Sequence, residues 1–186
     1  MSTTPDIDEA IAQHCWDRRS RLMYKLRVSV LYHLSRQKHF EDLDHGVSII
    51  TAVAATAAFA ALYKALPSAE GWTAGLTAAM AIYALVKNPA ASARMHAQAA
   101  SDFRRLLADC ERAGEHWTTG MCDEFTAKAV ELEASEPEVL TAVMADVQNR
   151  LNLASGDPND LVKLRPWQRW LMHWKNFDAA KLAAQR

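Results

Sequence analysis

Hydrophobic and polar positions divide this chain into a nearly uncharged middle part and two charged flanking parts. From Gly46 to Val86 the only charged residues are Lys64 and Glu70. A helix needs about 17–25 apolar residues to cross a hydrocarbon core of about 30 Å. Backbone in lipid must satisfy its own hydrogen bonds, so spanning segments of this kind are helical. The pattern therefore predicts a transmembrane helical hairpin over residues 46–86.

The two helices of this hairpin are expected at 46–66 and 70–87, joined by a turn at 64–70 that contains Pro67. A second interpretation is a buried hairpin within a soluble helical bundle, because the first stretch is mostly alanine and alanine contributes little to membrane insertion. Lysine and arginine residues flank both outer ends of the hairpin, which favours cytoplasmic termini. The sequence thus predicts a multi-pass membrane protein with both termini cytoplasmic, located in the inner membrane if the chain is bacterial, as the family resemblance given below implies.

The flanking parts show helical spacing of apolar residues. Residues 1–45 are predicted as an N-terminal cytoplasmic helix with a stripe at Leu22, Leu26, Val30 and Leu34. Residues 87–155 are predicted as a C-terminal cytoplasmic bundle. Its first helix alternates apolar positions by four and three, at Met95, Ala99, Phe103, Leu106, Cys110, Ala113 and Trp117. This alternation predicts a coiled-coil-like antiparallel pair with the first helix. No segment alternates with a period of two, so the fold class is all-α.

Residues 156–186 are predicted as a loop followed by a tryptophan-rich amphipathic tail. Before them, Ser135 and Glu138 around Pro137 predict a capping box that starts a helix. The tail has apolar residues at helical spacing, with basic residues beside them. It could lie in a membrane interface, dock on the bundle as core, or bind another protein. The candidate partner surface is Arg165, Trp167, Arg169, Trp170, Trp174 and Lys175.

Two rows of small residues in the second predicted span are candidates for function within the membrane. Gly71, Gly75 and Ala79 form a small-x-x-x-small row, the pattern that lets membrane helices approach closely. A second row could line an aqueous path, and it consists of Thr73, Thr77, Ala81 and Ala84. The alternative is that both rows pack a single monomeric hairpin.

Composition and motifs argue against enzymatic and nucleic-acid functions. The formal net charge is −1, so there is no global electrostatic attraction to nucleic acid. The three cysteines have no C-x-x-C spacing, and no metal, nucleophile-elbow, phosphate-loop or dinucleotide motif occurs. We therefore expect no enzyme activity, no catalytic residue, no metal and no cofactor.

The order of these parts resembles the SLATT family of bacterial two-transmembrane effectors, especially its short phage and prophage members. The resemblance covers roughly residues 18–112. It is carried by 26–33 and 40–44 before the first predicted span and, after the second, by His96, Ala100, Phe103 and Leu106.

The resemblance implies a self-assembling effector that forms pores or disrupts the inner membrane, causing abortive-infection death or arrest of the cell. The expected partners are further copies of the chain, membrane lipid, and a ring-forming or structural phage protein as trigger. The alternatives are a non-toxic membrane anchor or scaffold for a cytoplasmic partner, and a holin-like lysis protein.

Overall fold

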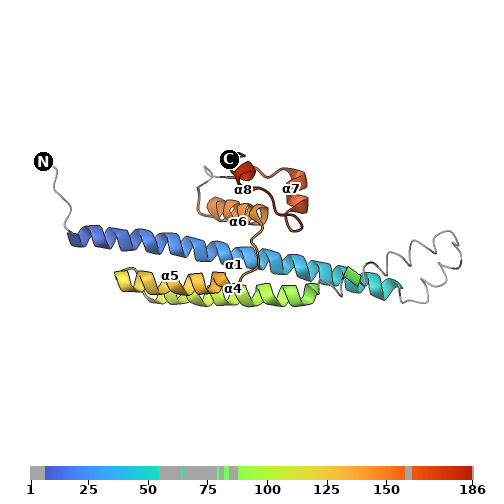
Figure 1. The fold of residues 1–186 in the computed structure, drawn as a ribbon, viewed down its shortest axis with the longest axis horizontal. Coiled ribbons are helices and arrows are strands. Elements are labelled where there is room, and N and C mark those ends of the chain that lie inside the picture. The colour runs from blue at the N-terminus through green and yellow to red at the C-terminus, as the bar shows by residue number, and fades with distance from the viewer. Residues whose placement is uncertain are drawn as a thin grey trace. The chain divides into compact units, whose positions relative to one another are not determined.

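The computed structural model describes residues 7–54, 64, 79, 82–83, 88–157 and 161–185. Every regular element in these ranges is a helix, which confirms the all-α part of the predicted fold class (Figure 1). The helices are α1 (Ile7–Ala54), α4 (Pro89–Arg112), α5 (Thr119–Ala134), α6 (Thr141–Ala154), α7 (Pro166–Leu171) and α8 (Ala179–Ala183).

The membrane part of the predicted fold is wrong. Among the described residues, no helix combines the length and the apolar character that a membrane span requires. The two-span hairpin and the multi-pass inner-membrane localisation are corrected accordingly. Most of the predicted hairpin, 46–86, lies outside the described residues.

The chain forms two compact units, one of Met1–Ser35 with Ala97–Arg186 and the other of Arg36–His96. In the first unit, α1 and α4 run antiparallel. Arg27 lies 3.2 Å from Glu111, and six residues later in α1 the ring of His33 stacks on Phe103 with ring centroids 5.6 Å apart. A later α1 residue therefore meets an earlier α4 residue. The antiparallel pairing predicted from the sequence is thus confirmed for this unit.

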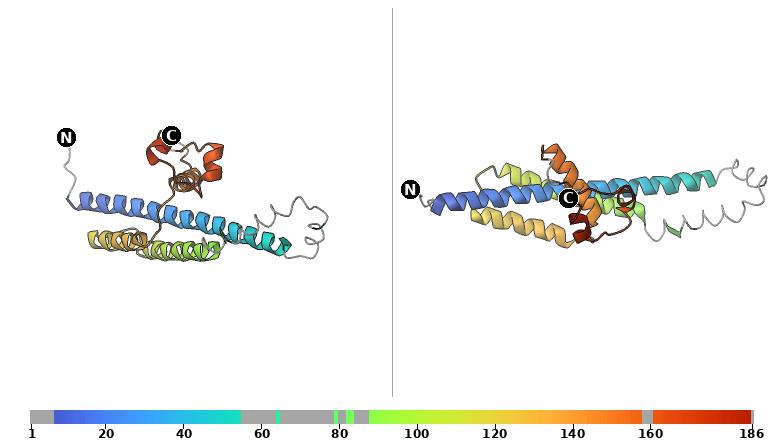
Figure 2. Two further views of the ribbon diagram at one scale, coloured as in Figure 1. Left: turned by 45° about the vertical axis from the view of Figure 1, so that its right-hand side comes forward. Right: turned by 90° about the horizontal axis from the view of Figure 1, so that it is seen from above.

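Helix α5 completes the bundle and runs parallel to α1. Its ion pairs keep the same order along both helices: Arg18 lies 2.8 Å from Asp123, and Lys25 lies 2.7 Å from Glu133. Figures 1 and 2 show α4 and α5 on one side of α1 and α6–α8 on the other. The first unit is therefore an up-down-up bundle with an additional group of short helices.

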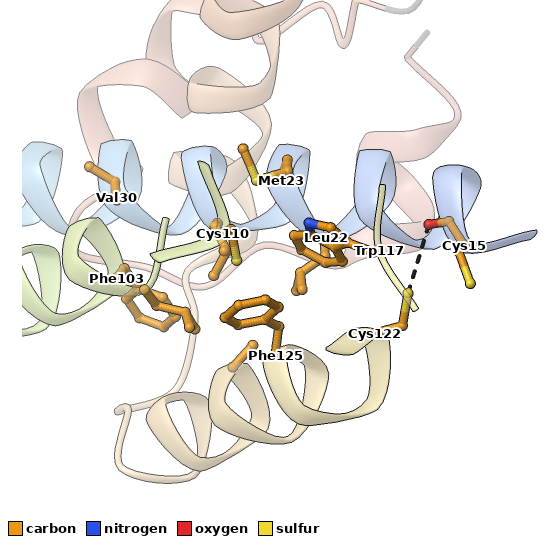
Figure 3. Close-up of a cluster of buried hydrophobic side chains, with 12 residues drawn as sticks. Cys15, Leu22, Met23, Val30, Phe103, Cys110, Trp117, Cys122 and Phe125 are labelled. Carbon is orange, nitrogen blue, oxygen red and sulfur yellow. Dashed lines mark hydrogen bonds between the residues drawn. The ribbon is translucent and has the colours of Figure 1, made fainter. Parts of the chain in front are cut away.

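The bundle core is aromatic and sulfur-rich (Figure 3). Leu26, Phe103 and Cys110 are at most 1 % exposed, and Trp117 packs against Phe125 with ring centroids 4.8 Å apart. The α1 stripe predicted from the sequence lies in this core at Leu22, Leu26 and Val30, with Leu34 packed against it. Removal of these aromatic and aliphatic side chains from water is the main favourable contribution to the folding free energy of this unit.

The predicted α4 seam is right at one end and wrong at the other. Phe103, Leu106, Cys110 and Trp117 are buried, as predicted, but Met95 is 48 % exposed. The buried α4 positions before Phe103 are Pro89, Ala93, His96 and Ala100, spaced by four, three and four residues, with Phe103 three residues further on. The predicted positions Met95 and Ala99 are thus replaced in the buried row by His96 and Ala100, each one residue later.

The second unit contains a small aromatic contact of its own. Phe40 stacks on His96 with ring centroids 5.6 Å apart, and the Arg36 guanidinium lies 4.7 Å from the Phe40 centroid. Burial lowers the pKa of His39, and the nearby Arg36 charge lowers it further.

Asn88 starts α4 from a positive φ of 40°, and its side-chain oxygen accepts a 3.1 Å hydrogen bond from the Ala91 amide.

Candidate protein-binding site

The tryptophan-rich tail folds into short helices instead of one long stripe. Helix α7 begins after Arg165, whose amide donates a 2.7 Å bond to the Gln168 side chain, with Pro166 in its first turn. It ends at Leu171, and residues 172–174 form a turn. Three tryptophans of this segment are exposed: Trp167 is 50 %, Trp170 is 79 % and Trp174 is 54 % exposed.

A small separate core holds the tail against α6. It contains Ala142, Ala145, Val162 and Leu182, with Leu164, Met172 and Phe177 packed against it. Docking as core was one of the three interpretations that the sequence left open for the tail, and it applies to these residues. None of the three exposed tryptophans belongs to this core.

Two asparagines fix the tail backbone. The side chain of Asn149 on α6 makes two hydrogen bonds to the backbone of Val162. It donates to the Val162 carbonyl at 2.7 Å and accepts from the Val162 backbone amide at 2.9 Å. Asn176 accepts a 3.1 Å bond from the Thr141 amide and donates a 2.7 Å bond to Glu138. These bonds satisfy backbone groups in a segment with little regular structure. They therefore position the exposed tryptophans on an ordered support.

Basic side chains surround the exposed rings. Arg165, Arg169 and Lys175 are exposed, as are their neighbours Trp170 and Trp174. Trp167 makes an edge contact with Phe177, with ring centroids 5.5 Å apart, beside a cavity of about 470 Å³. Three of the six residues of the predicted partner surface, Arg165, Trp167 and Lys175, thus line one cavity, and the other three, Arg169, Trp170 and Trp174, are exposed on the same segment. We call these six residues the tryptophan surface.

A larger cavity, which the sequence did not indicate, lies elsewhere in the same unit. It has a volume of about 530 Å³ and is formed by residues 24–29 of α1, residues 133–139 between α5 and α6, and Met144 and Gln148 of α6. Val28, Val139 and Met144 supply apolar walls. Glu133, Glu136 and Glu138 supply carboxylates, against the single cation Lys25. We call it the acidic cavity.

Two of these carboxylates are fixed by partners on α1. Glu133 pairs with Lys25 at 2.7 Å, and Glu136 Oε1 lies 3.1 Å from His33 Nε2. The His33 side chain is 1 % exposed and that of Glu136 is 11 % exposed. Tyr32, next to His33, accepts a 3.1 Å bond from the Leu140 amide. These contacts hold the connection between α5 and α6 against α1 and keep the cavity open beside it.

The predicted capping box at this connection is wrong, and its residues serve the cavity instead. Ser135 is the C-cap of α5, not the N-cap of α6, and its hydroxyl bonds back to the Leu132 carbonyl at 2.8 Å. Helix α6 starts only at Thr141, and Glu138 binds Asn176. The cavity depends on residues 24–29 meeting 133–139, more than a hundred positions away, and local patterns carry no signal for that pairing.

The other predicted site residues lie almost entirely outside the described part of the chain. These are Gly71 and Gly75 of the packing row and Thr73, Thr77, Ala81 and Ala84 of the candidate pore row. Ala79 is described and is exposed. Within the described ranges, no group of three or more His, Cys, Asp or Glu side chains is placed to hold a metal ion.

No family model, no curated protein and no solved structure matches this chain. The SLATT resemblance therefore stays a prediction from the sequence. Function must be argued from the two surfaces themselves.

Proposed function

We propose that this chain is a non-enzymatic protein-binding module, a helical scaffold that holds a partner protein on its tryptophan surface. The observation that supports it is the exposure of Trp167, Trp170 and Trp174 on a segment with its own core and backbone hydrogen bonds. Tryptophan and arginine are the residues most enriched among the anchors of protein interfaces. Here both types are concentrated in the same eleven-residue stretch, 165–175.

The energetics favour a partner over water as the neighbour of these rings. Each 100 Å² of apolar surface removed from water contributes about 2.5 kcal/mol. Ordered support matters too, because a surface that is already fixed loses less conformational entropy when it binds. The basic side chains Arg165, Arg169 and Lys175 indicate that the matching surface of the partner carries carboxylates.

A site-specific photo-cross-linker at position 170 tests the proposal in cells that express the chain. We expect one adduct of defined mass at position 170, suppressed when Arg169→Glu reverses the neighbouring charge. Trp16 on α1 is the matched control, since it is 47 % exposed but far from the tail in the sequence. The same adducts at positions 16 and 170 would contradict a specific binding surface.

The defence role implied by the SLATT resemblance is a prediction compatible with this module, and pore formation stays a prediction that the described residues do not test. A trigger from a phage would have to be read by an exposed surface. Survival of cells carrying wild-type or Trp170→Ala protein, with and without infection, measures this. Equal survival in all four cultures would count against the defence role.

A further inference from the structure

We infer that the partner of the tryptophan surface is a second copy of this chain, whose acidic cavity receives Trp170. The inference rests on the proposed function, because it names the partner of the same surface. It connects the most exposed tryptophan in the described structure with the largest cavity described above.

The cavity matches an indole ring in size and in the character of its walls. Its volume of about 530 Å³ lies within the roughly 300–1,000 Å³ of cavities that bind organic ligands. Val28 is buried at its base, while Tyr24, Lys25 and Glu138 are exposed around it, so the cavity opens to the surface. An aromatic ring in this space would be desolvated on its faces, as interface anchors are.

Charge complementarity selects this occupant. Three carboxylates and one ammonium give the cavity lining a formal charge of −2. Trp170, which we call the knob, lies in a segment of the opposite charge. It follows Arg169 directly, Arg165 lies one helical turn before Arg169, and no acidic residue occurs from 165 to 175. Opposite potentials across an interface steer association and fix its register. Arg169 would then face Glu138, whose side chain is the most exposed of the three acidic residues.

The contact is between two different surfaces, which determines the kind of assembly. Trp170 is not among the residues that line the cavity of its own chain. A knob on one copy and a cavity on the next form a heterologous contact, which propagates into a closed ring or an open filament. Each copy then has one cavity and one knob to share.

Two variants separate the halves of this contact. Trp170→Ala removes the knob and leaves the cavity intact. Val139→Arg places a cation among the cavity walls and leaves the knob intact. Trp16→Ala and Val130→Arg are the matched controls, because Trp16 and Val130 are 47 % and 54 % exposed and neither lines the cavity. Thermal melts establish that each variant is folded before assembly is compared.

Sedimentation velocity of the purified chain from about 1 to 100 μM covers the range in which a micromolar contact forms. We expect wild type and both controls to assemble with rising concentration. Trp170→Ala and Val139→Arg should each weaken association at least about 30-fold, as loss of an interface anchor does. An equimolar mixture of these two variants should form a dimer and nothing larger, because only one knob and one cavity survive.

Three results would overturn the inference: a monomeric wild type at every concentration, assembly of Trp170→Ala like wild type, or no dimer in the mixture. A monomeric chain that still cross-links at position 170 to a different protein would leave the proposed function standing. A chain that neither assembles nor gives a specific adduct would contradict both.

Discussion

The core of the helical bundle and the C-terminal tail differ in how much of their large aromatic side chains they expose. In the bundle, Phe103 is 1 %, Trp117 is 6 % and Phe125 is 8 % exposed. In the tail, Trp170 is 79 % and Trp174 is 54 % exposed. Both regions belong to the same compact unit, so the difference is not one between a folded part and an unfolded part. It distinguishes aromatics that stabilise the fold from aromatics that are available to a partner.

Helix length accounts for part of this difference. Helices α1, α4 and α5 are long enough to bury a continuous stripe, whereas α7 has 6 residues and α8 has 5. Helices this short are stable only through contacts with the rest of the protein. In the tail those contacts come from the small core around Val162 and Leu182 and from asparagine hydrogen bonds, and Trp170 belongs to neither.

The largest predicted effect is on the bundle. Phe103→Ala removes a ring that stacks on His33 in a fully packed core, and we expect it to lower the free energy of unfolding by about 3–5 kcal/mol. Chemical denaturation with a tryptophan fluorescence signal measures the change. A loss below about 1 kcal/mol would mean that the bundle core is not the main source of stability.

Sequence reasoning predicted the bundle better than the tail for a physical reason. Buried stripes recur every three or four residues, so Leu22, Leu26 and Val30 were identifiable from spacing alone. Register is harder to predict, because Met95 and His96 each lie four residues before an alanine of the same helix, and only packing decides which of the two is buried. The group of basic residues and tryptophans was also visible in the sequence, since it lies within one short segment.

Features that depend on contacts between distant segments could not be predicted from the sequence. The acidic cavity needs α1 to meet the connection between α5 and α6, and the helix predicted to begin at Ser135 begins at Thr141 instead. The membrane hairpin failed for another reason. It was inferred from the lack of charge over 46–86, and no helix among the described residues has the length and apolar character that a span requires.

An intermediate effect concerns the Cys110 thiol, which is fully buried beside the bundle aromatics. Burial, with a contribution from Asp109, raises its pKa from 9.0 to about 11. The unfolded chain therefore loses this proton more easily, so the stabilisation is present below pH 9 and is lost as the pH rises through about 11. We expect the loss to be about 1–3 kcal/mol.

Unfolding free energies of wild type and Cys110→Ala, measured from pH 8 to pH 11.5, isolate this contribution. The wild-type curve should fall more steeply than the variant curve above pH 9. Parallel curves would show that the thiol is not protected by the core. This pH dependence belongs to the bundle alone, because residues 161–186 of the tail contain no cysteine.

The smallest predicted effect on stability is at Trp170, and it is the one that most sharpens the contrast. Trp170 is 79 % exposed and outside the tail core, so Trp170→Ala should change the free energy of unfolding by no more than about 0.5 kcal/mol. Trp167→Ala, in the same helix, should cost about 0.5–1.5 kcal/mol because it removes the edge contact with Phe177. If Trp170→Ala destabilises the protein more than Trp167→Ala does, Trp170 contributes to the fold and is not reserved for a partner. If it leaves stability unchanged while weakening association, the exposed ring exists for binding.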